Sequence, residues 1–172
     1  MKLIRCDHSF SGEILAIFND AILNSAALYD YKPRTMENMA AWFDAKAKGS
    51  YPVIGAVAES GELMGFGSYG VFRDRPAYKY SVEHSLYVAA KFRGQGVGNA
   101  LLQEVIAATQ AQNYHVLVGC IDSANVASIK LHQRFGFTMA GTIRQCGFKF
   151  GRWLDADFYQ LVLPTPTHPV DG

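Results

Sequence analysis

Three glycines alternate in a short turn between an apolar segment and an amphipathic one. They are Gly94, Gly96 and Gly98; they follow Arg93, and the apolar segment ends at Val88. Glycine lets the backbone turn sharply with no side chain covering its N–H groups. At the start of a helix those N–H groups lack internal partners and lie at the positive end of the helix dipole. The residue types therefore predict a turn that binds a phosphate or pyrophosphate.

Two nucleotide-binding motifs do not fit the spacing of this turn. A dinucleotide fingerprint that starts at Gly94 needs glycine at its sixth position, which is Asn99. A P-loop ends in Gly-Lys-Ser/Thr, and no lysine follows Gly98. The pattern that remains is Arg93-x-x-Gly96-x-Gly98. A glycine-rich turn without a ligand stays open as the alternative.

A second group of polar residues follows an apolar strand pattern further along the chain. Asn125, Ser128 and His132 are spaced i, i+3 and i+7, so a helix places them on one stripe. The helix is expected to end before Gly136. Taken alone, such a stripe is more typical of a solvated helix face than of a binding site.

Together the two runs resemble the signatures of the GNAT N-acetyltransferase superfamily. The glycine turn resembles its acetyl-CoA pyrophosphate loop, and residues 125–137 resemble its second signature, Asn-x-x-(Ala/Ser)-x-x-Leu-(Tyr/His)-x-x-x-Gly-Phe. Four short stretches resemble the phosphinothricin and methionine sulfoximine acetyltransferase group within it: Phe18–Ala21, Ala41–Phe43, Val82–Ser85 and Lys149–Trp153. The region before residue 80 and the tail match more loosely.

The resemblance implies acetyl-CoA as co-substrate and no metal. It places the pantetheine arm between two splayed parallel strands, where the arm adds to exposed backbone as a further strand. It also implies that the Val88 N–H donates to the thioester carbonyl. The residues expected to contact the cofactor are Leu86, Tyr87, Val88, Arg93, Gly94, Gln95, Gly96, Val97, Gly98, Asn99, Asn125 and Ser128.

An amine that attacks a thioester must first lose a proton, because its ammonium form dominates near neutral pH. Strand alternation places Ser81, Glu83, Ser85 and Tyr87 on one face, and glutamate is disfavoured inside strands. We therefore expect Glu83 to be the general base, and the resemblance points to the same residue, acting through water. A surface carboxylate on a strand is the alternative.

His132 occupies the position at which many GNAT enzymes carry tyrosine. The resemblance implies that it protonates the departing CoA thiolate, which a histidine can do. A histidine bonded to the helix backbone, with water or unassisted release serving instead, is the alternative. His84 is expected on the strand face opposite Glu83. An acetyl-enzyme route through Cys120 is conceivable, but no base is evident beside it and the family uses direct transfer.

An amino-acid-like substrate needs a counter-charge for its carboxylate or phosphinate, and arginine is the better bidentate partner. The residues expected to contact the substrate are Phe72, Arg73, Arg75, Glu83, His84 and Ser85. The resemblance implies acetylation of the α-amine of a small analogue of the phosphinothricin, methionine sulfoximine or methionine sulfone type. Two alternatives stay open: acetylation of protein N-termini or lysines, and an acyl-CoA-binding regulator without catalysis.

Composition limits the partners and the compartment. The 172 residues carry a formal net charge of +1, so neither a nucleic acid nor a membrane surface is expected as a partner. Cys6, Cys120 and Cys146 lack metal-ligand spacing and are odd in number, which favours reduced thiols in the cytoplasm. The N-terminus lacks the apolar region of a signal peptide. The resemblance implies a homodimer.

The elements that must position these residues follow from the hydrophobic periodicity. Strands are predicted at 3–6, 51–59, 63–72, 80–88, 116–121, 138–148 and 158–163. A first helix is predicted to begin after a cap at Asp7, Ser9 or Ser11 and to end near Leu23, and further helices are predicted at 35–48, 99–111 and 125–135. This order predicts an α/β fold with a mixed sheet and helices on both faces. The resemblance adds that the sheet is mostly antiparallel with a central splayed parallel pair. We expect one domain over residues 1–163 and a flexible, proline-rich tail over 164–172.

Overall fold

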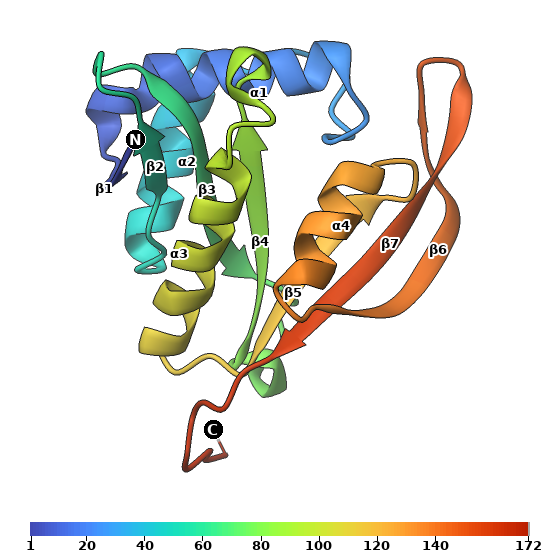
Figure 1. Ribbon diagram of the computed structural model, residues 1–172. Helices are drawn as coiled ribbons and strands as arrows, with labels where there is room; N and C mark the ends of the chain where they lie inside the picture. Colours follow the sequence, from blue (N-terminus) through green and yellow to red (C-terminus); the bar gives the residue numbers. More distant parts are fainter. Residues whose placement is uncertain (172) are drawn as a thin grey trace. The chain divides into compact units, whose positions relative to one another are not determined.

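The computed structural model describes residues 1–171 (Figure 1). The chain divides into two compact units. Unit 1 combines Met1–Ser68 with Ser85–Val105, and unit 2 combines Tyr69–His84 with the chain from Ile106 onward. The unit boundaries fall inside secondary-structure elements and not in loops. The single domain expected over residues 1–163 stays a prediction.

Seven strands run in the order β1-β2-β3-β4-β5-β7-β6. Strands β1 and β2, β2 and β3, β5 and β7, and β6 and β7 pair antiparallel, whereas β4 and β5 pair parallel. The mixed, mostly antiparallel sheet with one parallel pair is therefore confirmed, and the splay of that pair stays a prediction. The strand bounds are β1 Lys2–Arg5, β2 Ile54–Val57, β3 Leu63–Val71, β4 Ser81–Val88, β5 Val116–Asp122, β6 Thr138–Lys149 and β7 Arg152–Val162.

Four α-helices and three short 3-10 helices are present among residues 1–171. None of the helices in this range is long and apolar enough to cross a membrane. The α-helices are α1 Ser11–Asn24, α2 Met36–Lys48, α3 Val97–Ala111 and α4 Val126–Arg134, and the 3-10 helices are η1 His8–Phe10, η2 Pro76–Tyr78 and η3 Ala90–Phe92.

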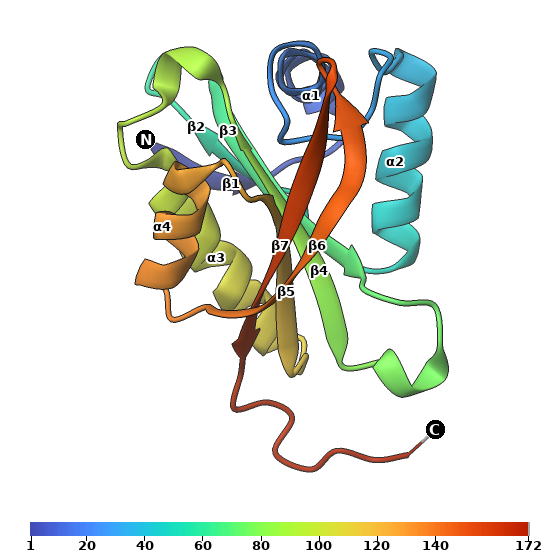
Figure 2. The same ribbon diagram turned by 90° about the vertical axis from the view of Figure 1, so that its right-hand side faces the viewer.

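Unit 1 has helices on both faces of its strands (Figure 2). On one face, the ring of Phe66 from β3 lies 4.9 Å from that of Phe18 on α1. On the other face, a Cβ atom at Gly65 would lie 2.6 Å from the Tyr87 carbonyl oxygen and 3.2 Å from the Leu101 side chain of α3. The absence of a side chain at Gly65 therefore lets β4 and α3 pack directly on β3.

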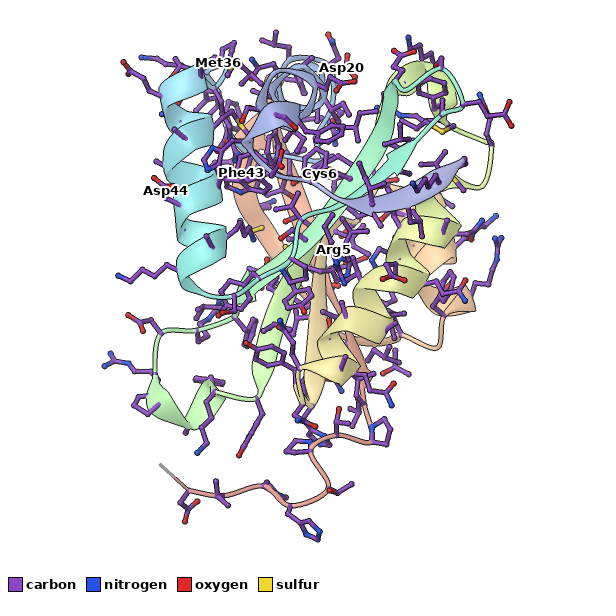
Figure 3. The ribbon with its side chains drawn as sticks, turned by 90° about the vertical axis from the view of Figure 1, so that its left-hand side faces the viewer. Arg5, Cys6, Asp20, Met36, Phe43 and Asp44 are labelled. Atoms are coloured by element: carbon purple, nitrogen blue, oxygen red, sulfur yellow. The ribbon has the colours of Figure 1, made fainter. Side chains whose placement is uncertain are left out.

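Local hydrogen bonds define the start of helix α2. The Thr35 hydroxyl accepts from the Asn38 N–H, and the Asn38 side chain accepts from the Thr35 N–H, which is a capping box for α2. Cys6 and Phe43 lie between α2 and the strands, whereas Asp44 lies on the outer side of α2 (Figure 3). Burial raises the pKa of the Cys6 thiol to about 12.

Unit 2 carries a long β-hairpin formed by β6 and β7 (Figure 1). The side chains of β6 are exposed along nearly its whole length, and its register against β7 shifts at two places. Strand β7 begins at Arg152, six residues before the start predicted from the sequence, because it pairs with β5 and β6 over its whole length.

The C-terminal tail makes hydrogen bonds with unit 2. The Thr165 hydroxyl donates to the Tyr114 carbonyl oxygen at 2.6 Å, and the His115 ring lies 2.8 Å from the Thr165 carbonyl oxygen. The Val170 N–H donates to the Tyr80 hydroxyl at 3.1 Å. These contacts join the tail to unit 2 at Thr165 and Val170. The flexibility expected for residues 164–172 stays a prediction.

Candidate functional site

The glycine turn has the backbone conformation that its sequence predicts. Gly94 and Gly96 have φ angles of +76° and +81°, and no atom lies within 4 Å of where a Cβ would stand. Glycine is therefore required here by the left-handed backbone and not by crowding. The turn leads directly into α3 at Val97, which brings the helix N-terminus to the same place.

The longer side chains of the turn are bonded back onto unit 1. The Arg93 Nε–H donates to the Val88 carbonyl oxygen at 3.3 Å, and its guanidinium lies 3.7 Å from the Asp20 carboxylate on α1. The Gln95 amide donates to the Lys91 carbonyl oxygen at 3.0 Å. With these side chains held back and Gly94 to Gly96 exposed, the backbone is what the turn offers to an anion.

The strand before the turn supplies the next group of expected cofactor contacts. Leu86, Tyr87 and Val88 are all half-buried. The Tyr87 ring lies 5.2 Å from Phe18 and 5.5 Å from Phe66, so it belongs to the aromatic core of unit 1. A contact between Tyr87 and a cofactor would therefore use its backbone and not its ring.

Asn125 and Ser128 meet at the start of α4. The Asn125 side chain accepts from the Ser128 N–H at 3.1 Å and caps the helix. Its amide nitrogen is not needed for the cap, and both residues are half-exposed. The pair thus combines a structural role with donor groups that remain able to hold a ligand.

Glu83 lies half-buried on β4 with a cation in its vicinity. Burial raises the pKa of its carboxyl group, and the positive charge of Arg73 acts in the opposite direction. The Arg73 side chain lies 4.5 Å over the Phe72 ring and donates to the Phe72 carbonyl oxygen at 2.9 Å. Unit 2 therefore brings together a carboxyl group suited to accept a proton and a cation suited to hold an anion.

Cys120 shares the face of Glu83. In the parallel register Glu83 pairs with Val118, so Val118 and Cys120 point to the same side as Glu83. Burial, then the nearby Glu83 carboxylate, raises the pKa of the Cys120 thiol to about 11. A thiol with so high a pKa is a poor nucleophile near neutral pH, which argues against an acetyl-enzyme route.

His84 lies on the opposite face, where we expected it. It pairs with Gly119 across the parallel register and contacts His132 of α4, at 3.1 Å between the two Nε2 atoms. His132 also places its Nδ1 2.7 Å from the Ser128 carbonyl oxygen. Both ring nitrogens of His132 are therefore engaged within the protein, and Glu83 and His132 lie on different faces of the strand pair.

The other residues expected to contact the substrate are Arg75, Ser85 and His84, and among residues 1–171 none of these three is hydrogen-bonded or ion-paired to the Glu83 side chain. Arg75 is exposed at the start of η2, and Ser85 is exposed on β4. His84 is only 6% exposed. Of the candidates in unit 2, the structure brings Arg73 near Glu83, and Phe72 contacts Arg73. The role of Arg75 stays a prediction.

The sequence analysis missed a buried acid in unit 2. One oxygen of Asp157 accepts from the hydroxyl groups of Ser123 and Thr142, both at 2.7 Å, and its charge contributes to the raised pKa of Cys120. The strand was predicted to begin at Phe158, so Asp157 was left outside it. The alternation of Leu154 with Ala156 is the signal that could have extended the strand.

The analysis also missed Arg34 in unit 1. Its guanidinium lies 4.0 Å over the Phe18 ring, and the Asn19 side chain bonds to both the N–H and the carbonyl oxygen of Arg34. The loop before α2 is therefore tied to α1 and presents a cation beside the aromatic core. No local spacing predicts this contact, because the partners lie 15 positions apart.

Comparisons with known proteins agree with one another. The profile of a family described as acetyltransferase (GNAT) domain matches residues 12–157. An L-methionine sulfoximine/L-methionine sulfone acetyltransferase of Pseudomonas paraeruginosa strain PA7 is 47% identical over 157 residues, which cover 91% of this chain and 91% of that protein. An L-amino acid N-acyltransferase of Escherichia coli K12 is 39% identical over 156 residues, covering 91% and 90%. The crystal structure of a GNAT superfamily phosphinothricin acetyltransferase from Sinorhizobium meliloti in complex with AcCoA matches with a TM-score of 0.94 at 32% identity, over 98% of this chain and 91% of that one.

Proposed function

Because the chain belongs to the GNAT acetyltransferase family, we propose that it transfers the acetyl group of acetyl-CoA to the α-amine of a small amino-acid analogue. Methionine sulfoximine, methionine sulfone and phosphinothricin are the acceptors that its relatives suggest. The observation that carries the proposal is the Glu83 carboxyl group, whose pKa is raised by burial and which has Arg73 in its vicinity. That arrangement suits a substrate with one ammonium group and one anionic group.

In the proposed reaction Glu83 accepts a proton from the substrate ammonium group, directly or through a water molecule. The free amine nitrogen then forms a bond to the thioester carbon while the carbon–sulfur bond breaks and the electron pair leaves on sulfur. The nitrogen then loses its second proton, and one proton is taken up by the thiolate, so that the products are the amide and the free thiol of CoA. Arg73 holds the carboxylate or phosphinate of the substrate.

The backbone N–H groups of the glycine turn hold the pyrophosphate of the co-substrate in this proposal. Arg93, Asn125 and Ser128 add donor groups, and the Val88 N–H donates to the thioester carbonyl as negative charge develops there. His132 remains the candidate proton donor for the thiolate. Its Nδ1 lies 2.7 Å from the Ser128 carbonyl oxygen. A proton on Nδ1 could therefore be given to the sulfur only if the hydrogen bond to Ser128 is broken.

Thiol release from acetyl-CoA in the presence of different amines tests the proposed function. We expect rapid release with methionine sulfoximine, methionine sulfone or phosphinothricin, and slower release with other free amino acids. Polyamines and peptides serve as acceptors from other classes. A preference for peptides would replace the proposal by a protein acetyltransferase, and binding of acetyl-CoA without turnover on any amine would leave the regulator.

We further propose that the protein is a cytoplasmic homodimer. The support for a dimer is strand β6, which exposes large apolar side chains at Met139, Ile143 and Phe148. The support for the cytoplasm is the set of free thiols at Cys6, Cys120 and Cys146. Sedimentation of the purified protein tests the dimer, and Ile143→Lys is expected to shift it toward monomer.

A further inference from the structure

Two histidines form a buried contact on the face of β4 that Glu83 does not share. The side chains of His84 and His132 are 6% and 3% exposed, and their rings stack with centroids 5.0 Å apart at 18°. Phe137 packs edge-on against both rings. A Cβ atom at Gly119 would lie 3.0 Å from the Nε2 of His84 and 3.2 Å from that of His132, so the pair occupies the space that this glycine leaves.

The contacts assign a proton to each ring. A carbonyl oxygen only accepts, so the His132 Nδ1 at 2.7 Å from the Ser128 oxygen carries a hydrogen. In a neutral ring the other nitrogen of His132 is then an acceptor, and His84 must supply the hydrogen between the two Nε2 atoms. The Nδ1 of His84 is left as a bare acceptor, buried and without a partner among residues 1–171.

This arrangement opposes protonation of His132. A second hydrogen on its Nε2 would face the hydrogen of His84, unless His84 moved its own proton to Nδ1. That position has no acceptor among residues 1–171, so the hydrogen there would be a buried donor without a partner. Burial also lowers the pKa of both rings, and burial together with the charge of His132 lowers the pKa of His84 to about 3.

Among residues 1–171, no charged side chain offsets this opposition. The charge of His132 adds to burial in lowering the pKa of His84, and burial lowers the pKa of His132 more than the hydrogen bond to the Ser128 carbonyl oxygen raises it. Glu83 and Cys120 lie on the other face of their strands. Lys130 and Arg134 on α4 are exposed, and as cations they would disfavour a positive charge on His132.

We infer that His84 is a positioning residue that holds His132 in its neutral, Nδ1-protonated form and thereby fixes α4 against the parallel strands. The inference deepens the proposed function, because α4 carries Asn125 and Ser128 at the expected cofactor site and His132 is the candidate proton donor. It also bears on His132 as the candidate proton donor: the one proton of this neutral imidazole is held by the Ser128 carbonyl oxygen, so the thiolate would have to take its proton from water.

Nitrogen-15 NMR of the histidine rings in the full chain tests the inference. In the wild-type protein we expect His132 to stay neutral with its proton on Nδ1 from about pH 8 to about pH 5. In His84→Gln the amide can turn its oxygen toward His132, so a protonated His132 gains an acceptor. We expect the pKa of His132 to be at least about one unit higher in this variant, roughly a tenfold change in proton affinity.

A matched control is His8→Gln, because His8 is exposed and lies in unit 1; it should leave the His132 signals unchanged. In kinetics, His84→Gln should add an inflection to the pH profile at the pKa that NMR reports for His132.

Two results would overturn the inference: a wild-type His132 that carries its proton on Nε2, or a His132 that titrates in His84→Gln as it does in wild type. If His84→Gln does not fold, the wild-type spectrum still decides. If wild type acetylates no amine, the proposed function fails while the NMR result stands.

Discussion

At Glu83, burial and a neighbouring guanidinium act in opposite directions on the same carboxyl group. Burial favours the neutral acid, so the carboxylate is a stronger base once it forms. The positive charge of Arg73 favours the ionised carboxylate near neutral pH. At Cys120 the positive charge of Arg73 lowers the pKa by less than burial and the Glu83 carboxylate raise it. The thiol pKa of about 11 leaves Cys120 almost entirely protonated at neutral pH. The difference decides which of the two side chains can exchange protons with a substrate.

Glu83→Gln removes the proposed base while keeping its size. We expect kcat to fall by about 10²- to 10⁴-fold, the range typical of general-base catalysis, with little change in the affinity for acetyl-CoA. Steady-state kinetics at saturating acetyl-CoA measures the effect. Glu59→Gln, at an exposed position in unit 1, is the control and should keep wild-type rates. Full turnover by the Glu83 variant would remove the assignment.

Arg73→Met removes the cation that favours ionised Glu83. Because the carboxylate loses this stabilisation, its pKa rises further, and the acid limb of the kcat/KM profile should move to higher pH by about half a unit to one unit. The KM for the amine should also rise, since Arg73 is proposed to hold its anionic group. Arg5→Met, at an exposed position in unit 1, is the control and should leave both the acid limb and the KM for the amine unchanged. An acid limb unchanged in Arg73→Met would show that the charge of Arg73 does not reach the base.

At the scale of elements, local signals predicted the parts of the site that depend on short stretches. The turn could be predicted because the positive φ angles at Gly94 and Gly96 favour glycine at this spacing, whereas Gly98 lies within α3. The first half of β7 could not, because it contains Asp155 and Asp157, and aspartate is depleted in strands. Pairing with β5 and β6 outweighs that local preference. The contact of His84 with His132 joins residues 48 positions apart and leaves no trace in local periodicity.

Gly96→Ala places a side chain on a left-handed backbone that leads into α3. We expect a loss of about 1–2 kcal/mol in the free energy of unfolding and a higher KM for acetyl-CoA. Gly61→Ala is a matched control, because Gly61 also has a positive φ, +89°, and open space around it. Urea denaturation should show similar losses for both variants, and kinetics should show a KM increase for Gly96→Ala alone. An equal KM in the two variants would separate the turn from the cofactor.

At the scale of the whole molecule, the histidine pair makes folding sensitive to acid. The folded pKa values of His84 and His132 lie below the ordinary value of 6.5 in an unfolded chain. Between these values the unfolded chain binds more protons, so the stability present above about pH 6.5 is lost as the pH falls. The slope is about 1.4 kcal/mol per pH unit for each proton. Glu83, whose folded pKa is raised, acts in the opposite direction and reduces the slope.

Urea denaturation between about pH 7 and about pH 5 measures this slope. We expect His84→Gln to reduce it by close to one proton, or about 1.4 kcal/mol per pH unit, because one buried neutral histidine is removed. His8→Gln, which replaces an exposed histidine, should leave the slope at its wild-type value. Identical slopes for wild type and His84→Gln would mean that His84 does not resist protonation in the folded chain.

The division of the chain also bears on how it is made. Each unit consists of two separate segments, and Tyr69–His84 interrupts the sequence of unit 1. During synthesis the ribosome must therefore release Val105 before unit 1 has all its parts, by which time the first segment of unit 2 is already outside and lacks its partners. Protein segments that wait in this way expose apolar surface. A nascent chain paused shortly after residue 105 is the stage at which we expect the greatest demand for a chaperone.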